Sequence, residues 1–92
     1  MTVAQRLREA TTVPDSRRPA RVRELLKRDL SIASNKSSAI FSTAAELMVL
    51  GHRDWKTYVY TTGRKYGVSR YECNNTIAKL PEYVRQALNN ER

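Results

Sequence analysis

The sequence predicts an all-α fold built as one small domain. Three glycines and three prolines are spread over 92 residues, so few positions favour turns over helices. Apolar residues recur at helical spacing across 36–62, and capping signals stand near the ends of the expected helices. A chain of this length encloses one small hydrophobic core, so a second domain is not expected.

The N-terminal part divides into a tail and a first helix. Residues 3–10 could form two helical turns, but residues 11–16, which contain Pro14, are typical of a break. We therefore expect residues 1–18 to form a flexible tail, mobile or ordered only by a partner. The folded domain is then expected over 19–92. Its first helix is predicted over 19–28, where Pro19 suits the first helical position because an N–H is not needed there.

The central segment carries the clearest pattern. At 100° per residue, its apolar side chains fall within one arc of about 160°. This predicts a single helix over 36–62, with Ser34 or Asn35 as its cap. Gly51 lies inside this helix, where glycine costs up to about 1 kcal/mol relative to alanine. A close helix crossing there explains the glycine, and a break at Gly51 and His52 is the competing interpretation.

Two shorter helices are expected after the next loop. Ser69 and Glu72 have the spacing of a capping box, which predicts a helix over 70–80. Pro81 then restarts the chain as a last helix over 81–89, because proline suits the first turn of a helix.

This order of helices predicts that the chain needs a partner. Helices of about ten residues cannot cover the apolar arc of a rod roughly 40 Å long. Leaving four or five of its large side chains in water would forgo on the order of 10 kcal/mol, which is comparable with the whole stability of a domain. The residues expected to face the partner are Leu25, Ile40, Phe41, Ala44, Leu47, Met48, Trp55, Tyr58, Val59, Ile77, Leu80 and Val84.

Charge and composition point to a polyanion rather than to catalysis. Seventeen Lys and Arg against nine Asp and Glu give a net charge of +8, which favours nucleic acid as a partner. Cys73 and His52 are the sole cysteine and histidine, so neither an internal disulfide nor a zinc cluster is expected. The sequence has no glycine-rich phosphate loop and no catalytic constellation, so we expect no enzyme, cofactor or small-molecule substrate. No apolar run reaches the roughly 20 residues of a membrane span, so we expect no membrane partner.

Three stretches resemble known families. Residues 19–27, Pro-Ala-Arg-Val-Arg-Glu-Leu-Leu-Lys, resemble the first helix of the A-type core histone and of the C subunit of nuclear factor Y. Residues 32–35 and 39–49 look like the histone-fold subunits of DNA polymerase epsilon and of the chromatin accessibility complex, which carry a similar Ala-Ala-Glu-Leu string. Residues 77–83 are similar to the third helix and the start of the last helix in that group, so the likeness covers about 19–88.

The resemblance implies a histone fold, with short, long and short helices followed by a C-terminal helix. It implies a heterodimer with a B-type histone-fold partner similar to the B subunit of nuclear factor Y. That dimer would bind double-stranded DNA without sequence specificity, as an accessory part of DNA polymerase epsilon or of a chromatin-remodelling complex in the nucleus. The second loop departs from the family, because Lys65 is followed by Tyr66 where Thr or Ser is usual, and Glu72 stands in the place of the family's acid.

The histone-fold arrangement places the first helix and the two loops along one DNA-facing edge. Arg21 matches a DNA-contacting arginine of the A-type histone. The residues expected to contact phosphate are Arg17, Arg18, Arg21, Lys27, Arg28, Lys36, Arg64, Lys65 and Arg70.

Two other functions fit the same residues. The pair could be a pure assembly module that does not bind DNA. Alternatively, a chain broken at Gly51 could be a self-sufficient helix-turn-helix regulator, which folds without a partner and prefers one DNA sequence.

Overall fold

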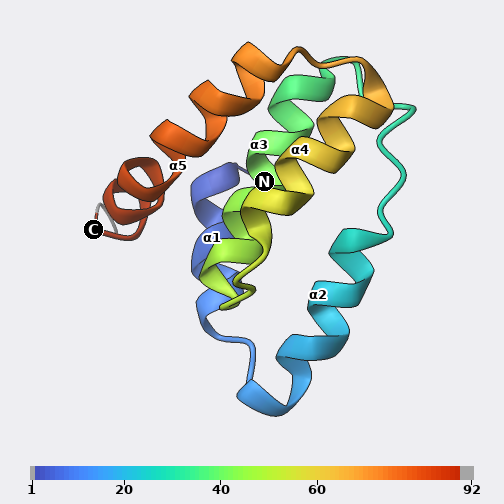
Figure 1. Ribbon diagram of the computed structural model, residues 1–92. Helices are drawn as coiled ribbons and strands as arrows, with labels where there is room; N and C mark the ends of the chain where they lie inside the picture. The colour runs from blue at the N-terminus through green and yellow to red at the C-terminus, as the bar shows by residue number, and fades with distance from the viewer. Residues whose placement is uncertain (1, 90–92) are drawn as a thin grey trace.

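The computed structural model describes residues 2–89 and contains helices only within them (Figure 1). The all-α prediction is therefore confirmed. In chain order the elements are α1 (Val3–Thr11), a short 3₁₀ turn η1 (Asp15–Arg17), α2 (Arg18–Leu26), α3 (Lys36–Val49), α4 (Trp55–Tyr66) and α5 (Arg70–Asn89).

The N-terminal segment is a packed helix, so the prediction of a flexible tail over 1–18 is wrong for the described residues. The side-chain oxygen of Thr2 accepts a hydrogen bond from the Gln5 N–H at 3.1 Å, and the Thr2 N–H donates to Gln5 at 2.7 Å. This capping box starts α1. Leu7 is fully buried and Ala10 is 5% exposed, because α1 packs on α3 and α5. The spacing of Val3, Leu7 and Ala10 follows one helix face, and our sequence interpretation gave that spacing too little weight.

The central helix is broken at Gly51, so the prediction of one helix over 36–62 is wrong and the competing interpretation is confirmed. Gly51 has a φ of +84°, a left-handed conformation that side chains with a Cβ rarely adopt. The Gly51 N–H donates to the Met48 carbonyl at 3.0 Å, and the His52 N–H donates to the Leu47 carbonyl at 3.0 Å. These two bonds form a Schellman motif that ends α3.

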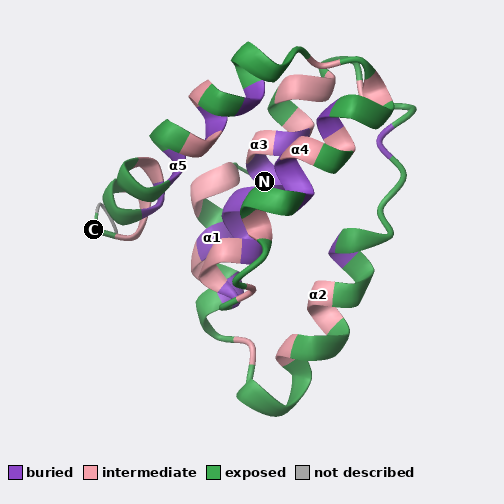
Figure 2. Cartoon of the chain, in the orientation of Figure 1, coloured by how far each residue is buried: buried purple, intermediate pink, exposed green. Residues whose placement is uncertain are grey.

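The break turns α4 back along α3, and Figure 1 shows the two helices side by side in opposite directions. The far end of α4 is held where α3 begins, because the Leu30 N–H before α3 donates to the Tyr66 hydroxyl at 3.1 Å. Helix α3 is consequently covered by α1, α4 and α5. Figure 2 shows the resulting run of buried positions on α3, among which Ala44 and Leu47 have no exposed surface.

Helix α5 continues through Pro81, which corrects the division into helices over 70–80 and 81–89. Proline removes one N–H from the helical hydrogen bonds, so it usually weakens or kinks a helix interior. Leu80 is fully buried and Val84 is 7% exposed, so both sides of the proline pack on the core. This packing keeps the helix continuous.

Helix α2 lies at the edge of the bundle, and Figure 2 shows that most of its surface is exposed. Leu25 is its one buried residue, at 1% exposure. The helix begins at Arg18 and ends at Leu26, within two residues of the predicted bounds at both ends. The exposed cations Arg17, Lys27 and Arg28, which the sequence singled out, flank this helix at its two ends.

The apolar residues assigned to a partner interface already lie in the core of this chain or against it. Phe41, for example, meets Tyr83 edge to face, with ring centroids 5.0 Å apart. The buried members are Leu25, Ile40, Ala44, Leu47, Tyr58, Val59, Leu80 and Val84, and the partly buried ones are Phe41, Met48, Trp55 and Ile77. The physical reason for requiring a partner, an apolar arc left in water, does not hold for this arrangement.

We predict that removing the Leu7 side chain destabilises the chain strongly. Leu7→Ala leaves a cavity between α1, α3 and α5, so the free energy of unfolding should fall by about 2–5 kcal/mol. Urea unfolding of the purified chain, followed by far-ultraviolet circular dichroism and Trp55 fluorescence, measures this change. The matched control is Leu26→Ala, whose side chain is 43% exposed, with an expected loss below about 1 kcal/mol. Equal losses for the two variants would show that α1 is not docked.

Candidate nucleic-acid interface

Arg18 belongs to the predicted DNA-contact set, but its side chain faces the bundle. Its Nε donates to the Val13 carbonyl at 3.0 Å, and its Nη1 donates to the Val49 carbonyl at 3.3 Å. A third, longer bond reaches the carbonyl of Thr11 at 3.4 Å. A cation is favourable at these positions, because the carbonyl ends of α1 and α3 carry partial negative charge. Arg18 therefore joins α2 to two other helices.

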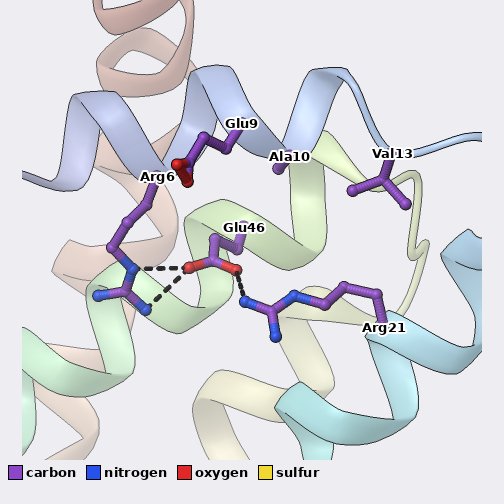
Figure 3. Close-up of a pocket in the computed structure, with 6 residues that line it drawn as sticks. All are labelled: Arg6, Glu9, Ala10, Val13, Arg21 and Glu46. Carbon is purple, nitrogen blue, oxygen red and sulfur yellow. Dashed lines mark hydrogen bonds and ion pairs between the residues drawn. The ribbon is translucent and has the colours of Figure 1, made fainter. Parts of the chain in front are cut away.

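Arg21 also points inward, where it shares a buried carboxylate with Arg6 (Figure 3). Glu46 on α3 is 2% exposed. One of its oxygens accepts from the Arg6 Nε at 2.8 Å, and the other pairs with the Arg21 Nη2 at 3.1 Å. Two guanidinium groups thus balance one carboxylate that has been removed from water, which is what a buried charge requires.

The Arg6–Glu46–Arg21 cluster connects α1, α3 and α2 beside a hollow of about 300 Å³. Figure 3 shows Glu9, Ala10 and Val13 along its rim. Sequence reasoning missed this cluster because it placed Arg6 in a flexible tail, far from the central helix. The available signal was the placement of Arg6 one residue before Leu7, on a segment with helical spacing.

Lys36 is the third predicted contact that bonds within the chain, because its ammonium group donates to the Ala33 carbonyl. The other predicted contacts have exposed side chains, which leaves them accessible to an external anion. We call these six residues the basic surface: Arg17, Lys27, Arg28, Arg64, Lys65 and Arg70.

The two parts of the basic surface meet where the end of α4 contacts the segment after α2. The Tyr66 hydroxyl donates to the Asp29 carboxylate at 3.3 Å and accepts from the Leu30 N–H at 3.1 Å. The pKa of Asp29 lies below its usual value, first because the Ser31 N–H donates to the carboxylate and also because the charge of Lys65 is near. The Tyr66 contacts therefore place the end of α4, which carries Lys65, beside the segment that follows α2.

The turn between α4 and α5 brings Arg64 and Arg70 to one hollow. Gly67 adopts a left-handed φ of +77° and ends α4, and the Ser69 hydroxyl accepts from the Glu72 N–H at 3.1 Å to start α5. This cap confirms the predicted helix start at residue 70. The chain direction thus changes within a few residues, and cations on both helices face the same space.

Other kinds of site find no support in the described chain. Among residues 2–89, no group of three or more His, Cys, Asp and Glu side chains is placed to hold a metal ion. Within the same range, no helix is long and apolar enough to cross a membrane. Comparison with known proteins adds no candidate. No family model, curated protein or solved structure matches the chain.

We predict that Glu46→Gln weakens the attachment of α1 and α2. The amide keeps the shape of the side chain but leaves two guanidinium groups without a negative charge between them. The free energy of unfolding should fall by about 1–3 kcal/mol in urea titrations. Glu24→Gln is the matched control, because its side chain is 67% exposed and pairs with Arg21 only at 3.6 Å. That change should cost less than about 0.5 kcal/mol. A Glu46→Gln variant as stable as this control would refute the role given to the cluster.

Proposed function

We propose that the chain is a non-catalytic, self-contained helical module that binds the backbone of double-stranded DNA without reading its sequence. The observation that carries this proposal is that the predicted contact cations form two groups, one bonded within the fold and one exposed. Those that face the bundle are matched by Glu46 or by backbone carbonyls. Those of the basic surface lie at the two ends of α2 and around the α4–α5 turn, where an external polyanion can reach them.

The binding mechanism is electrostatic. Each Lys or Arg that neutralises a phosphate releases condensed counterions, so the affinity falls as salt rises. Arginine adds geometry to the charge, because its planar guanidinium can donate two parallel hydrogen bonds to phosphate oxygens. Contacts of this kind position a protein on DNA but carry no sequence information.

A DNA-binding role carries over from the histone-fold resemblance, whereas the obligatory partner does not. The histone plan depends on one long central helix, and here the corresponding segment folds back at Gly51. The helix-turn-helix alternative anticipated this break. Its two helices, however, cross at roughly 90–120°, whereas α3 and α4 run antiparallel (Figure 1). A self-contained module that contacts the DNA backbone agrees better with the reversal at Gly51 and with the antiparallel arrangement of α3 and α4.

An assembly role is the second candidate, and two exposed apolar side chains favour it. Ile32 is 92% exposed and Tyr71 is 74% exposed. Ile32 lies before α3, four residues after Arg28, and Tyr71 lies in the first turn of α5, directly after Arg70. Large apolar side chains in such positions are suited to a protein contact. The chain would then be an accessory part of a larger complex that acts on DNA, such as a polymerase or a chromatin remodeller.

We predict that the salt dependence of DNA affinity comes in part from the three cations of the basic surface that flank α2. Replacing Arg17, Lys27 and Arg28 by Gln should lower the slope of log affinity against log salt by about 2–3, because each lost phosphate contact removes about 0.9. Fluorescence anisotropy with a short labelled duplex measures this slope. The matched control replaces Arg53, Lys56 and Lys79, which are exposed outside the basic surface, and should leave the slope nearly unchanged.

Two outcomes would replace the proposed function with one of its alternatives. A chain that shows no duplex binding even at low salt supports the assembly role instead. Strong preference for one duplex among several unrelated sequences of equal length supports a sequence-reading regulator. Size-exclusion chromatography with light scattering, on the chain alone, tests the self-contained fold, since a partner-dependent chain would be aggregated or unfolded.

A further inference from the structure

Arg64 and Arg70 line a hollow of about 190 Å³ between α4 and α5, which we call the corner hollow. The other residues that line it are Tyr60, Val68 and Cys73. None of these five residues is acidic. The hollow therefore combines two guanidinium groups with no carboxylate along its lining.

The hollow beside the Arg6–Glu46–Arg21 cluster provides an internal comparison. There too two arginines approach one space, but Glu46 lies between them and both of its oxygens are bound. Paired guanidinium groups repel each other unless an anion lies nearby. In the first case the chain supplies that anion, and in the corner hollow the lining supplies none.

Arg70 stacks on an aromatic ring of α4. Its guanidinium carbon lies 4.7 Å from the centroid of the Tyr60 ring, within the range of a cation–π contact. The Tyr60 hydroxyl in turn donates to the Asn74 side chain, one turn further along α5. The ring is thus fixed at both ends, so Arg70 loses little freedom when it binds a ligand. Among residues 2–89, no carboxylate pairs with the hydrogen-bonding edge of Arg70.

The surroundings of the corner hollow also favour an anion. Cys73 on its wall lies in the first turn of α5, where backbone N–H groups leave a partial positive charge. Burial, and to a smaller extent the charge of Glu72, raises the pKa of the Cys73 thiol above its usual value, so at neutral pH this group adds no negative charge. Glu72, the nearest acid in sequence, lines a different hollow, with Ser37 and Phe41 of α3.

We propose that the corner hollow binds one phosphate group, with Arg64 and Arg70 on its oxygens and Tyr60 as the residue that positions Arg70. The phosphate belongs either to a nucleic-acid backbone or to a free phosphate ion, and both share the same tetrahedral oxyanion chemistry. Where it belongs to DNA, this inference rests on the proposed function and names one of its contact points.

The experiment uses the full chain labelled with ¹⁵N and titrated with inorganic phosphate at constant ionic strength. We expect saturable shifts of the backbone amides of Val68 and Cys73 and of the Arg70 Nε–H signal. Arg64→Gln and Arg70→Gln should each weaken phosphate binding about tenfold, since each removes a charged hydrogen-bond donor. The Arg53→Gln, Lys79→Gln double variant is the matched control and should bind phosphate as the parent chain does.

Variants of Tyr60 test positioning separately from folding. Tyr60→Phe keeps the ring under Arg70 and should stay within about twofold of the parent affinity, whereas Tyr60→Leu removes the ring and should lose about fivefold. Circular dichroism verifies that each variant is folded. If Tyr60→Leu does not fold, Arg70→Lys takes its place, because it keeps the charge but loses the planar stack and should also lose several-fold. Equal phosphate affinity in the phenylalanine and leucine variants, or in Arg70→Lys and the parent, would overturn the positioning role.

A duplex competition separates this inference from the proposed function. If phosphate shifts the corner signals and a short duplex displaces it, both proposals hold. If phosphate binds there but no duplex binds to the chain, the corner hollow is a free-phosphate site and the proposed function fails. If the duplex binds while phosphate leaves the corner signals unmoved, and the Arg64→Gln, Arg70→Gln double variant binds duplex like the control, the corner hollow is overturned and DNA binding stands.

Discussion

The left-handed turn at Gly51 determines how this chain buries its apolar surface. With a φ of +84° and no Cβ, Gly51 lets the chain reverse after Leu50, and the two bonds of the Schellman motif satisfy the end of α3. Helix α4 then covers the side of α3 that a straight rod would leave in water. Because α1 and α5 close the remaining sides, Ala44 and Leu47 have no exposed surface. The apolar arc that suggested a second chain is thus covered within this one.

Helical periodicity indicated where the helices are but not how the central pair is connected. The same apolar positions fit one straight helix and a helical hairpin. A turn of a few residues barely changes the helical spacing of the apolar residues on its two sides. Gly51 was the visible signal, and its cost inside a helix is only about 1 kcal/mol, which tertiary packing easily offsets. Similarly, Pro81 was read as a helix start, whereas burial of Leu80 and Val84 on both sides of it keeps α5 whole. In both cases contacts distant in sequence decided the outcome.

At the candidate site, too, contacts between residues far apart in the sequence decide the outcome. The sequence reveals how many cations the chain carries, but not which of them are neutralised within the fold. Arg17 and Arg18 are neighbours, yet Arg17 is exposed while Arg18 bonds the carbonyl ends of α1 and α3. Arg21 meets Glu46, which lies 25 residues away along the chain. Only the packing of three helices brings these groups together, so no local motif could have separated them.

The inward cations and the exposed ones depend on each other. Helix α2 has one buried residue, Leu25, so hydrophobic packing alone holds it weakly. Arg18 and Arg21 add hydrogen bonds to α1 and α3 and thereby set the direction in which the rest of α2 faces. A cation that bonds within the fold is no longer available to an external phosphate. It does, however, fix the position of the neighbouring cations that remain exposed. Such ordering favours binding, because a rigid array of charges loses less freedom when it meets a polyanion than a mobile tail does. A basic tail with the same net charge would attract DNA equally at a distance, yet it would bind with less defined geometry.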